Sequence, residues 1–146
     1  MSKRLVLENE FAHLWFHPEA GVVHSELRKF VWGEAYQQLM NEGLDLLVRE
    51  GACKWLSENR QSTVYSREDT EWAMNVFMPR AAKNGFKYWA IVPPENVIGQ
   101  MNMERIASVS KPYGVEARLF GDGPAALNWL EGIVPTIGRP EVNPRG

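Results

Sequence analysis

Three histidines are the first candidates for chemistry in this chain, because imidazole binds metal ions and transfers protons near neutral pH. His13 and His17 lie four residues apart in a segment of alternating polarity. On an extended strand, four residues span about 13 Å, which is too far for both rings to bind one metal ion. Only His13, His24 and Glu26 are able to converge, if the next segment pairs back on the first. We therefore expect a mixed polar sheet face and no metal site.

The other reactive side chains have simpler interpretations. Acid–base catalysis needs convergent carboxylates or a histidine beside one. Glu68, Asp69 and Glu71 instead stand at the start of a predicted helix, where negative charge stabilises the helix dipole. Cys53 is the only cysteine and is expected to pack as a small apolar residue. We therefore expect no catalytic residue, no cofactor and no enzymatic activity.

A polar loop is the best candidate for a binding surface. It follows a predicted strand and precedes a predicted helix, and ligands of α/β sheets bind beyond the carboxyl ends of strands. A helix N-terminus at this place favours anions, and a phosphate with roughly −1.5 to −2 charges would pair with Arg60 or Arg67. The residues expected to contact a protein partner or to be phosphorylated are Ser57, Asn59, Arg60, Ser62 and Thr63. A solvated loop of turn-forming residues is the alternative.

An apolar pocket is the second candidate site. The chain has 6 Trp and 6 Met residues, and methionine is common at adaptable binding surfaces. The residues expected to line the pocket are Trp72, Phe77, Trp89, Met101 and Met103. The same residues at helical spacing also fit a plain hydrophobic core.

The overall composition limits the functional classes. The length of 146 residues fits one domain, and a formal net charge of −2 without a basic run argues against a nucleic-acid binder. No apolar stretch approaches the ~18 residues of a membrane span, and the first ten residues do not form a signal peptide. A single cysteine favours a reducing compartment, so the expected location is the cytoplasm.

The elements that must position these residues alternate between strands and helices. The alternation predicts a hairpin of strands 11–17 and 22–27 with His17 opposite Val22. Further strands are predicted at 54–57, 86–92 and 115–120, and helices at 31–50, 66–84, 95–110 and from 123. Ser66 is the predicted N-cap of the second helix, and Asp122 or Gly123 that of the last. Pro79 is expected to kink or interrupt the second helix. The order β-β-α-β-α-β-α-β-α predicts an α/β domain with a mixed, mostly parallel sheet and an N-terminal antiparallel hairpin.

The domain is expected to span residues 11–134. Residues 1–10 are interpreted as an N-terminal extension, and residues 135–146 as an extended or disordered tail. Helical spacing predicts that the first helix buries Trp32, Ala35, Tyr36, Leu39, Met40, Leu44, Leu47 and Val48. It predicts that the third helix buries Val97, Ile98, Met101, Met103, Ile106 and Val109.

Three local segments resemble the SpoIIAA-like group of STAS domains. They are Trp55-Leu56-Ser57-Glu58-Asn59-Arg60, the segment 66–72 that opens a helix, and the apolar strand 85–93. With residues 120–122 and 126–130, the resemblance covers roughly residues 11–131. It implies a β/α sheet, a cytosolic setting and protein–protein signalling. In the family's anti-sigma antagonists a partner kinase phosphorylates a Ser after the third strand, but the family's Asp-Ser pair is replaced here by Ser57-Glu58.

The expected function is therefore a non-enzymatic, STAS-like binding or signalling module. It would bind a protein partner, or another copy of itself, through the polar loop. A carrier or sensor of an apolar small molecule is an alternative, by analogy with the CRAL-TRIO lipid-transfer domains that the fold also resembles. The remaining alternative is an enzyme of undetected chemistry.

Overall fold

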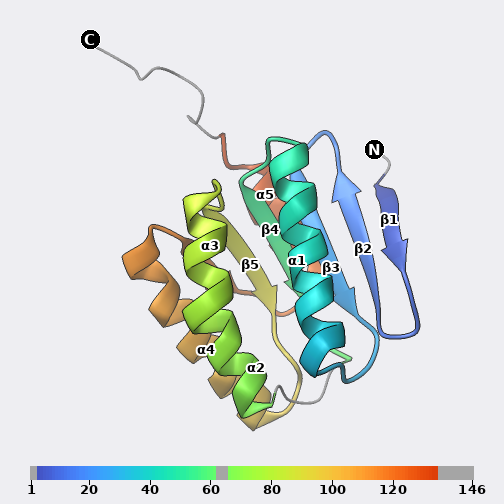
Figure 1. The fold of residues 1–146 in the computed structure, drawn as a ribbon. Coiled ribbons are helices and arrows are strands. Elements are labelled where there is room, and N and C mark those ends of the chain that lie inside the picture. Colours follow the sequence, from blue (N-terminus) through green and yellow to red (C-terminus); the bar gives the residue numbers. More distant parts are fainter. Residues whose placement is uncertain (1–2, 62–65, 135–146) are drawn as a thin grey trace.

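Six strands form one sheet in the order in which they occur along the chain (Figure 1). The computed structural model describes residues 3–61 and 66–134. The strands are β1 (Arg4–Glu8), β2 (Ala12–His17), β3 (Val22–Leu27), β4 (Lys54–Glu58), β5 (Tyr88–Val92) and β6 (Glu116–Leu119). The β1–β2 and β2–β3 pairs are antiparallel, and the three remaining pairs are parallel. The expected α/β class with a mixed sheet is confirmed.

The helices are distributed unequally over the two faces of the sheet. They are α1 (Gly33–Arg49), α2 (Arg67–Trp72), the π-helix η1 (Ala73–Phe77), α3 (Met78–Lys83), α4 (Val97–Ser110), the 3₁₀-helix η2 (Lys111–Tyr113) and α5 (Gly123–Glu131). Because the strand order never reverses, right-handed crossovers place α1 to α4 on one face. Figure 1 shows α1 and α3 in front of the sheet and α5 behind it. Helix α5 packs on Val22 of β3 and on β4 and β5, which leaves the outer face of β1 and β2 without a covering helix in the described chain.

The hairpin has the predicted register, with His17 opposite Val22, Trp15 opposite His24 and Glu26 opposite His13. A difference appears before it, in the segment that sequence analysis treated as an extension. Residues Arg4–Glu8 of that segment form β1, which pairs with β2 and is the first strand of the sheet. This short strand is mostly exposed, so it lacks the apolar alternation by which strands are recognised. Residues 135–146, the predicted tail, lie outside the described residues.

The second predicted helix is continuous, but it changes its winding before Pro79. Segments α2, η1 and α3 follow one another without a break. A proline inside a helix has no N–H, and its ring clashes with the carbonyl group four residues earlier. The wider π turn directly before Pro79 relieves this conflict and keeps the helix on the sheet. At its start Ser66 is the expected N-cap, and its Oγ accepts a bond from the Asp69 N–H at 3.1 Å.

The core has two layers, one between the sheet and α1 to α4 and one between the sheet and α5. Several residues that were predicted to be buried are exposed: Trp32, Val48, Val97, Ile98 and Met101. Trp32 is the N-cap of α1 and precedes its apolar stripe, and Val48 lies at the edge of that stripe. Helix α4 covers the last strand, β6, so only its side that faces the sheet is buried. Within the described residues, no helix is both long and apolar enough to cross a membrane.

Candidate functional site

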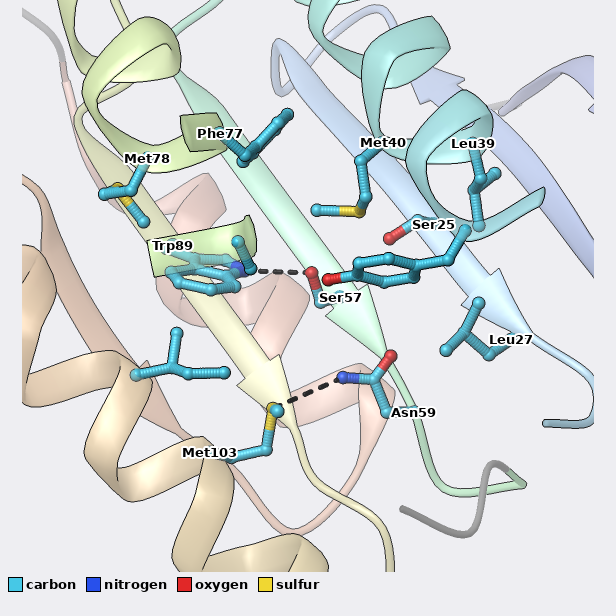
Figure 2. A pocket seen from close by; sticks show the side chains of 13 residues that line it. Ser25, Leu27, Leu39, Met40, Ser57, Asn59, Phe77, Met78, Trp89 and Met103 are labelled. Carbon is cyan, nitrogen blue, oxygen red and sulfur yellow. Dashed lines mark hydrogen bonds between the residues drawn. The ribbon is translucent and has the colours of Figure 1, made fainter. Parts of the chain in front are cut away.

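Residues of the predicted polar loop and of the predicted apolar pocket line one internal cavity together (Figure 2). Ser57 and Asn59 were expected in an exposed loop, but both side chains are buried. They meet Phe77, Trp89 and Met103 from the predicted apolar pocket. Strand β4 extends one residue further than predicted, to Glu58, and Asn59 continues its alternation. Both side chains therefore point toward the helices rather than toward solvent.

The cavity is small. It lies between the sheet and helices α1, η1, α3 and α4, and its volume is about 20 Å³. A space of this size holds about one water molecule. The expected apolar ligand would therefore fit only if a wall of the cavity moved. The other lining residues are Ser25, Leu27, Tyr36, Leu39, Met40, Ala73, Met78 and Ile106.

Two serine side chains of the cavity accept hydrogen bonds from buried tryptophans. The indole N–H of Trp89 donates to Ser57 Oγ at 2.9 Å, and that of Trp55 donates to Ser25 Oγ at 3.0 Å. Both serines come from adjacent strands and face each other in the register. A buried indole N–H without an acceptor would be costly, so these serines have a structural role. Ser57 is thus inaccessible to a kinase in the folded domain.

Two residues of the predicted pocket lie elsewhere. Trp72 packs on the outside of the cavity, with its ring 5.6 Å from that of Phe77. Met101 is on the solvent side of α4 and is 61% exposed. It neighbours Val97 and Ile98, which are 70% and 64% exposed, and we call these three residues the α4 apolar surface. Residues three and four apart on a helix share a side, so these side chains form one patch.

Arg60 is the member of the predicted loop that remains at the surface. Its Nη1 donates to the Gly121 carbonyl at 2.6 Å, and its Nη2 donates to Glu95 Oε2. Gly121 follows β6 and Glu95 follows β5, so Arg60 joins the carboxyl ends of β4, β5 and β6. Glu95 also comes two residues before α4, which places this ion pair next to the α4 apolar surface. Ser62 and Thr63, the other members of the loop, lie outside the described residues.

His17 and His24 form a hydrogen-bonded chain with Glu58 on the outer sheet face. His17 Nε2 lies 3.0 Å from His24 Nδ1, and His24 Nε2 lies 2.7 Å from Glu58 Oε1. With Glu58 ionised, His24 Nε2–H donates to the carboxylate, which leaves His24 Nδ1 to accept from His17 Nε2–H. Of His13, His24 and Glu26, the three residues able to converge, only His13 and Glu26 approach each other. His13 Nδ1 lies 3.4 Å from Glu26 Oε1, whereas His24 turns to Glu58.

The chain continues to helix α5 through Glu58. A Cβ placed on Gly123 would lie 2.6 Å from Glu58 Oε2, so only glycine leaves room for the carboxylate. Gly123 is the first residue of α5, where a negative charge is stabilised by the helix dipole. No group of three or more His, Cys, Asp or Glu side chains able to hold a metal ion occurs in residues 3–61 and 66–134.

Burial, hydrogen bonding and neighbouring charges shift the pKa of two groups in the hydrogen-bonded chain, His17 and Glu58. Burial, then the charges of His24 and Lys3, lower the pKa of His17 from 6.5 to about 4. The hydrogen bond from His24 lowers the pKa of Glu58, against the effect of burial, with help from the charges of His24, Lys3 and Arg60. Elsewhere, burial raises the pKa of the Cys53 thiol, which disfavours the nucleophilic thiolate.

These shifts predict that the domain loses stability in mild acid. Between pH 6.5 and about 4 the unfolded chain binds more protons at His17 than the folded domain does, so the free energy of unfolding falls as the pH falls. Below pH 4.5 the loss of the Glu58 carboxylate adds to this effect. We expect the free energy of unfolding of His17→Gln to depend less steeply on pH between pH 6.5 and about 4 than that of the wild-type chain. Urea denaturation at a series of pH values measures this dependence. His13→Gln, on the same strand, is the control, and an unchanged slope in His17→Gln would contradict the assignment.

A comparison of the chain with protein-family models, with curated proteins and with solved structures found no match. The chain is an α/β domain with a closed core, a histidine–glutamate chain on the outer sheet face beside α5, and an apolar helix surface beside the carboxyl edge of the sheet.

Proposed function

We propose that this chain is a non-enzymatic protein-binding module whose partner sits on the α4 apolar surface. The observation that carries the proposal is the exposure of Val97, Ile98 and Met101, at 70%, 64% and 61%. Single exposed apolar residues are ordinary, but a group of large ones at an element's end marks an interaction surface. Burial of such side chains stabilises a complex by about 1.5–3 kcal/mol each when they become fully buried.

The surroundings of this surface suit a protein interface. The Arg60–Glu95 ion pair borders the start of α4, and both side chains are exposed, at 42% and 73%. An apolar centre with a polar, solvent-accessible rim is the usual composition of a binding interface. The surface also lies at the carboxyl edge of the parallel strands, where α/β domains usually bind. The proposed contact region is therefore in the first turns of α4 and not at Ser57 and Asn59 of the predicted loop.

The small-molecule carrier is less well supported by the geometry. The cavity has the composition of a binding site, since Ser57 and Asn59 face Phe77, Trp89 and Met103. Its volume of about 20 Å³ nevertheless requires a helix to move before any ligand larger than water can enter. The α4 apolar surface needs no such movement. Partner binding also agrees with the cytoplasmic signalling role that the resemblance to the SpoIIAA-like group implies.

The test is to place a charge in the middle of the surface. We expect Ile98→Glu to weaken partner binding at least tenfold, because an unpaired carboxylate would be buried in an apolar contact. The wild-type chain and the variant are compared by crosslinking and co-purification from cells that produce the chain, and then by titration against the captured protein. Val48→Glu is the matched control, because Val48 is exposed on α1, outside this surface. Equal capture of one protein by all three chains would reject the α4 apolar surface as its binding site.

A further inference from the structure

In the part of the chain that the structure describes, strand β6 ends the sheet with a hydrogen-bonding edge that no other strand occupies. The N–H of Glu116 donates to the Lys87 carbonyl at 2.9 Å, and that of Phe120 donates to the Ile91 carbonyl at 2.8 Å. Because successive N–H groups of a strand point in opposite directions, those of Ala117 and Leu119 point away from β5. Within the described residues β6 pairs with β5 alone. An edge of this kind is a template for pairing with another strand.

A groove runs along this edge, between β6 and α4. Its volume is about 830 Å³. Small side chains lie on both sides of it, Ala107 and Ser108 on α4 and Ala117 on β6. Ala107 and Ala117 also pack on the core. An approaching strand would therefore meet no bulky side chain at the middle of the groove.

The charges on β6 make the edge complementary to itself. Glu116 and Arg118 flank Ala117, form an ion pair with each other at 3.2 Å and are both more than half exposed, at 51% and 57%, so each also remains accessible to a second copy. If two copies pair antiparallel about a twofold axis at Ala117, Glu116 of each copy stands opposite Arg118 of the other. Ala117 then faces its own equivalent, and the two exchange both of their N–H to carbonyl bonds. Opposite charges in such cross-strand pairs are stabilising, and like charges are destabilising.

Helix α4 repeats the same symmetry. Glu104 of α4 and Lys111, its C-cap residue and the first residue of η2, line the groove seven residues apart. They therefore lie on one side of the helix, with Ala107 and Ser108 midway between them. The twofold axis that relates the two β6 strands also makes the two α4 helices antiparallel. Glu104 of one copy is then directed toward Lys111 of the other. One twofold rotation therefore brings opposite charges together both at the β6 strands and at the α4 helices.

We propose that β6 pairs with β6 of a second copy of this chain to form a twofold symmetric dimer with a continuous sheet. Charged residues on an edge strand often prevent pairing, but they do so by repulsion or by lacking a partner. Here the alternation of sign gives each charge an opposite neighbour in the second copy. A twofold interface requires this self-complementarity. The dimer uses other residues than the proposed partner contact at Val97 and Ile98, so either proposal can fail alone.

The test is a charge exchange followed by sedimentation velocity over a concentration series at low ionic strength. We expect the wild-type chain to dimerise, and Glu116→Arg and Arg118→Glu each to raise the dissociation constant at least tenfold, because each places like charges opposite each other. An equimolar mixture of the two variants should form a heterodimer, and the double variant should dimerise again. Arg105→Glu, an exposed change on α4 outside the groove, is the control.

Two results would overturn the proposal. One is a wild-type chain that stays monomeric throughout the concentration series. The other is a dimer that neither single variant weakens, which would place the contact elsewhere. Circular dichroism and thermal melting confirm that each variant is folded, since an exposed ion pair such as Glu116–Arg118 contributes little to the stability of the fold. Loss of the dimer with capture of the partner intact would leave the proposed function standing.

Discussion

Replacement of Lys54 by methionine is expected to lower the free energy of unfolding by about 2–3 kcal/mol, because hydrogen bonds from a charged donor to buried acceptors contribute about 1.5–3 kcal/mol. The Lys54 side chain is buried, and its Nζ donates to the carbonyl groups of Leu130, Ile133 and Ala20 at 2.8, 2.7 and 3.2 Å. All three donors of an ammonium group are thus used. Burial lowers the pKa of Lys54, but three acceptors around one nitrogen require the ammonium form.

The physical reason for so large a loss is the position of these acceptors. Leu130 lies in the last turn of α5 and Ile133 just beyond it, where helix carbonyl groups lack full intrahelical pairing. The Leu130 carbonyl also accepts from the Ile133 N–H at 3.2 Å, so the Ile133 and Ala20 carbonyls depend most on Lys54. The positive charge also compensates the negative end of the helix dipole. Methionine fills a similar volume but cannot donate, so the carbonyl groups would be left without their partner.

Urea denaturation measures this prediction directly. Lys87→Met is the matched control, because Lys87 is exposed and its loss should change stability by less than about 0.5 kcal/mol. A loss below about 1 kcal/mol in Lys54→Met would mean that water replaces the ammonium group without cost, contrary to the expected penalty for an unsatisfied buried acceptor.

Gly43→Ala is expected to destabilise the domain by about 2–3 kcal/mol, the cost of overpacking a close-packed core. Helix propensity alone predicts a gain of about 1 kcal/mol, because alanine is the better helix former. The added Cβ would however lie 2.4 Å from Cη2 of Trp55. Trp55 is fully buried and packs edge-on against Phe77, and its N–H is fixed by Ser25. The ring therefore has no direction in which to move.

A double-mutant cycle tests the cause of this effect. Trp55→Phe shortens the ring that faces Gly43, so in that background the cost of Gly43→Ala should fall by more than 1 kcal/mol, as expected for residues in contact. Gly132→Ala is the control, because its Cβ would make ordinary contacts at 3.6 Å or more. Equal costs of Gly43→Ala in both backgrounds would show that the overlap with Trp55 is not the reason.

Local features of the chain could be predicted because they depend on near neighbours. The alternation of residues 11–17 and 22–27 correctly predicted the hairpin register, since a shift by one residue would turn its apolar face to solvent. Ser66 caps α2 as predicted, and Asp122 caps α5 by accepting from the Ala125 N–H at 2.8 Å. These contacts span three residues or fewer, so short-range spacing contains the information.

The candidate sites could be predicted only in part. Phe77, Trp89 and Met103 do meet, but Ser57 and Asn59 join them inside the core because β4 continues past its apolar residues. The bond between His17 and His24 was missed, since it runs diagonally across the hairpin and needs the third member, Glu58, from β4. Edge strand β1 was missed because a strand that is exposed on both faces has no apolar period.

The sequence by itself determined the α/β class, the order of most elements, the hairpin register and the helix caps, because each follows from hydrophobic period and local hydrogen bonding. Only the tertiary structure decided which residues face solvent near element ends. Whether Met101 or Ser57 is buried depends on how far α4 and β4 extend and on what covers them. The same holds for β6. Its alternating charges can pair with a second copy only because, in the described residues, no further strand lies beside it. Long-range packing sets these outcomes, and no spacing within one segment encodes them.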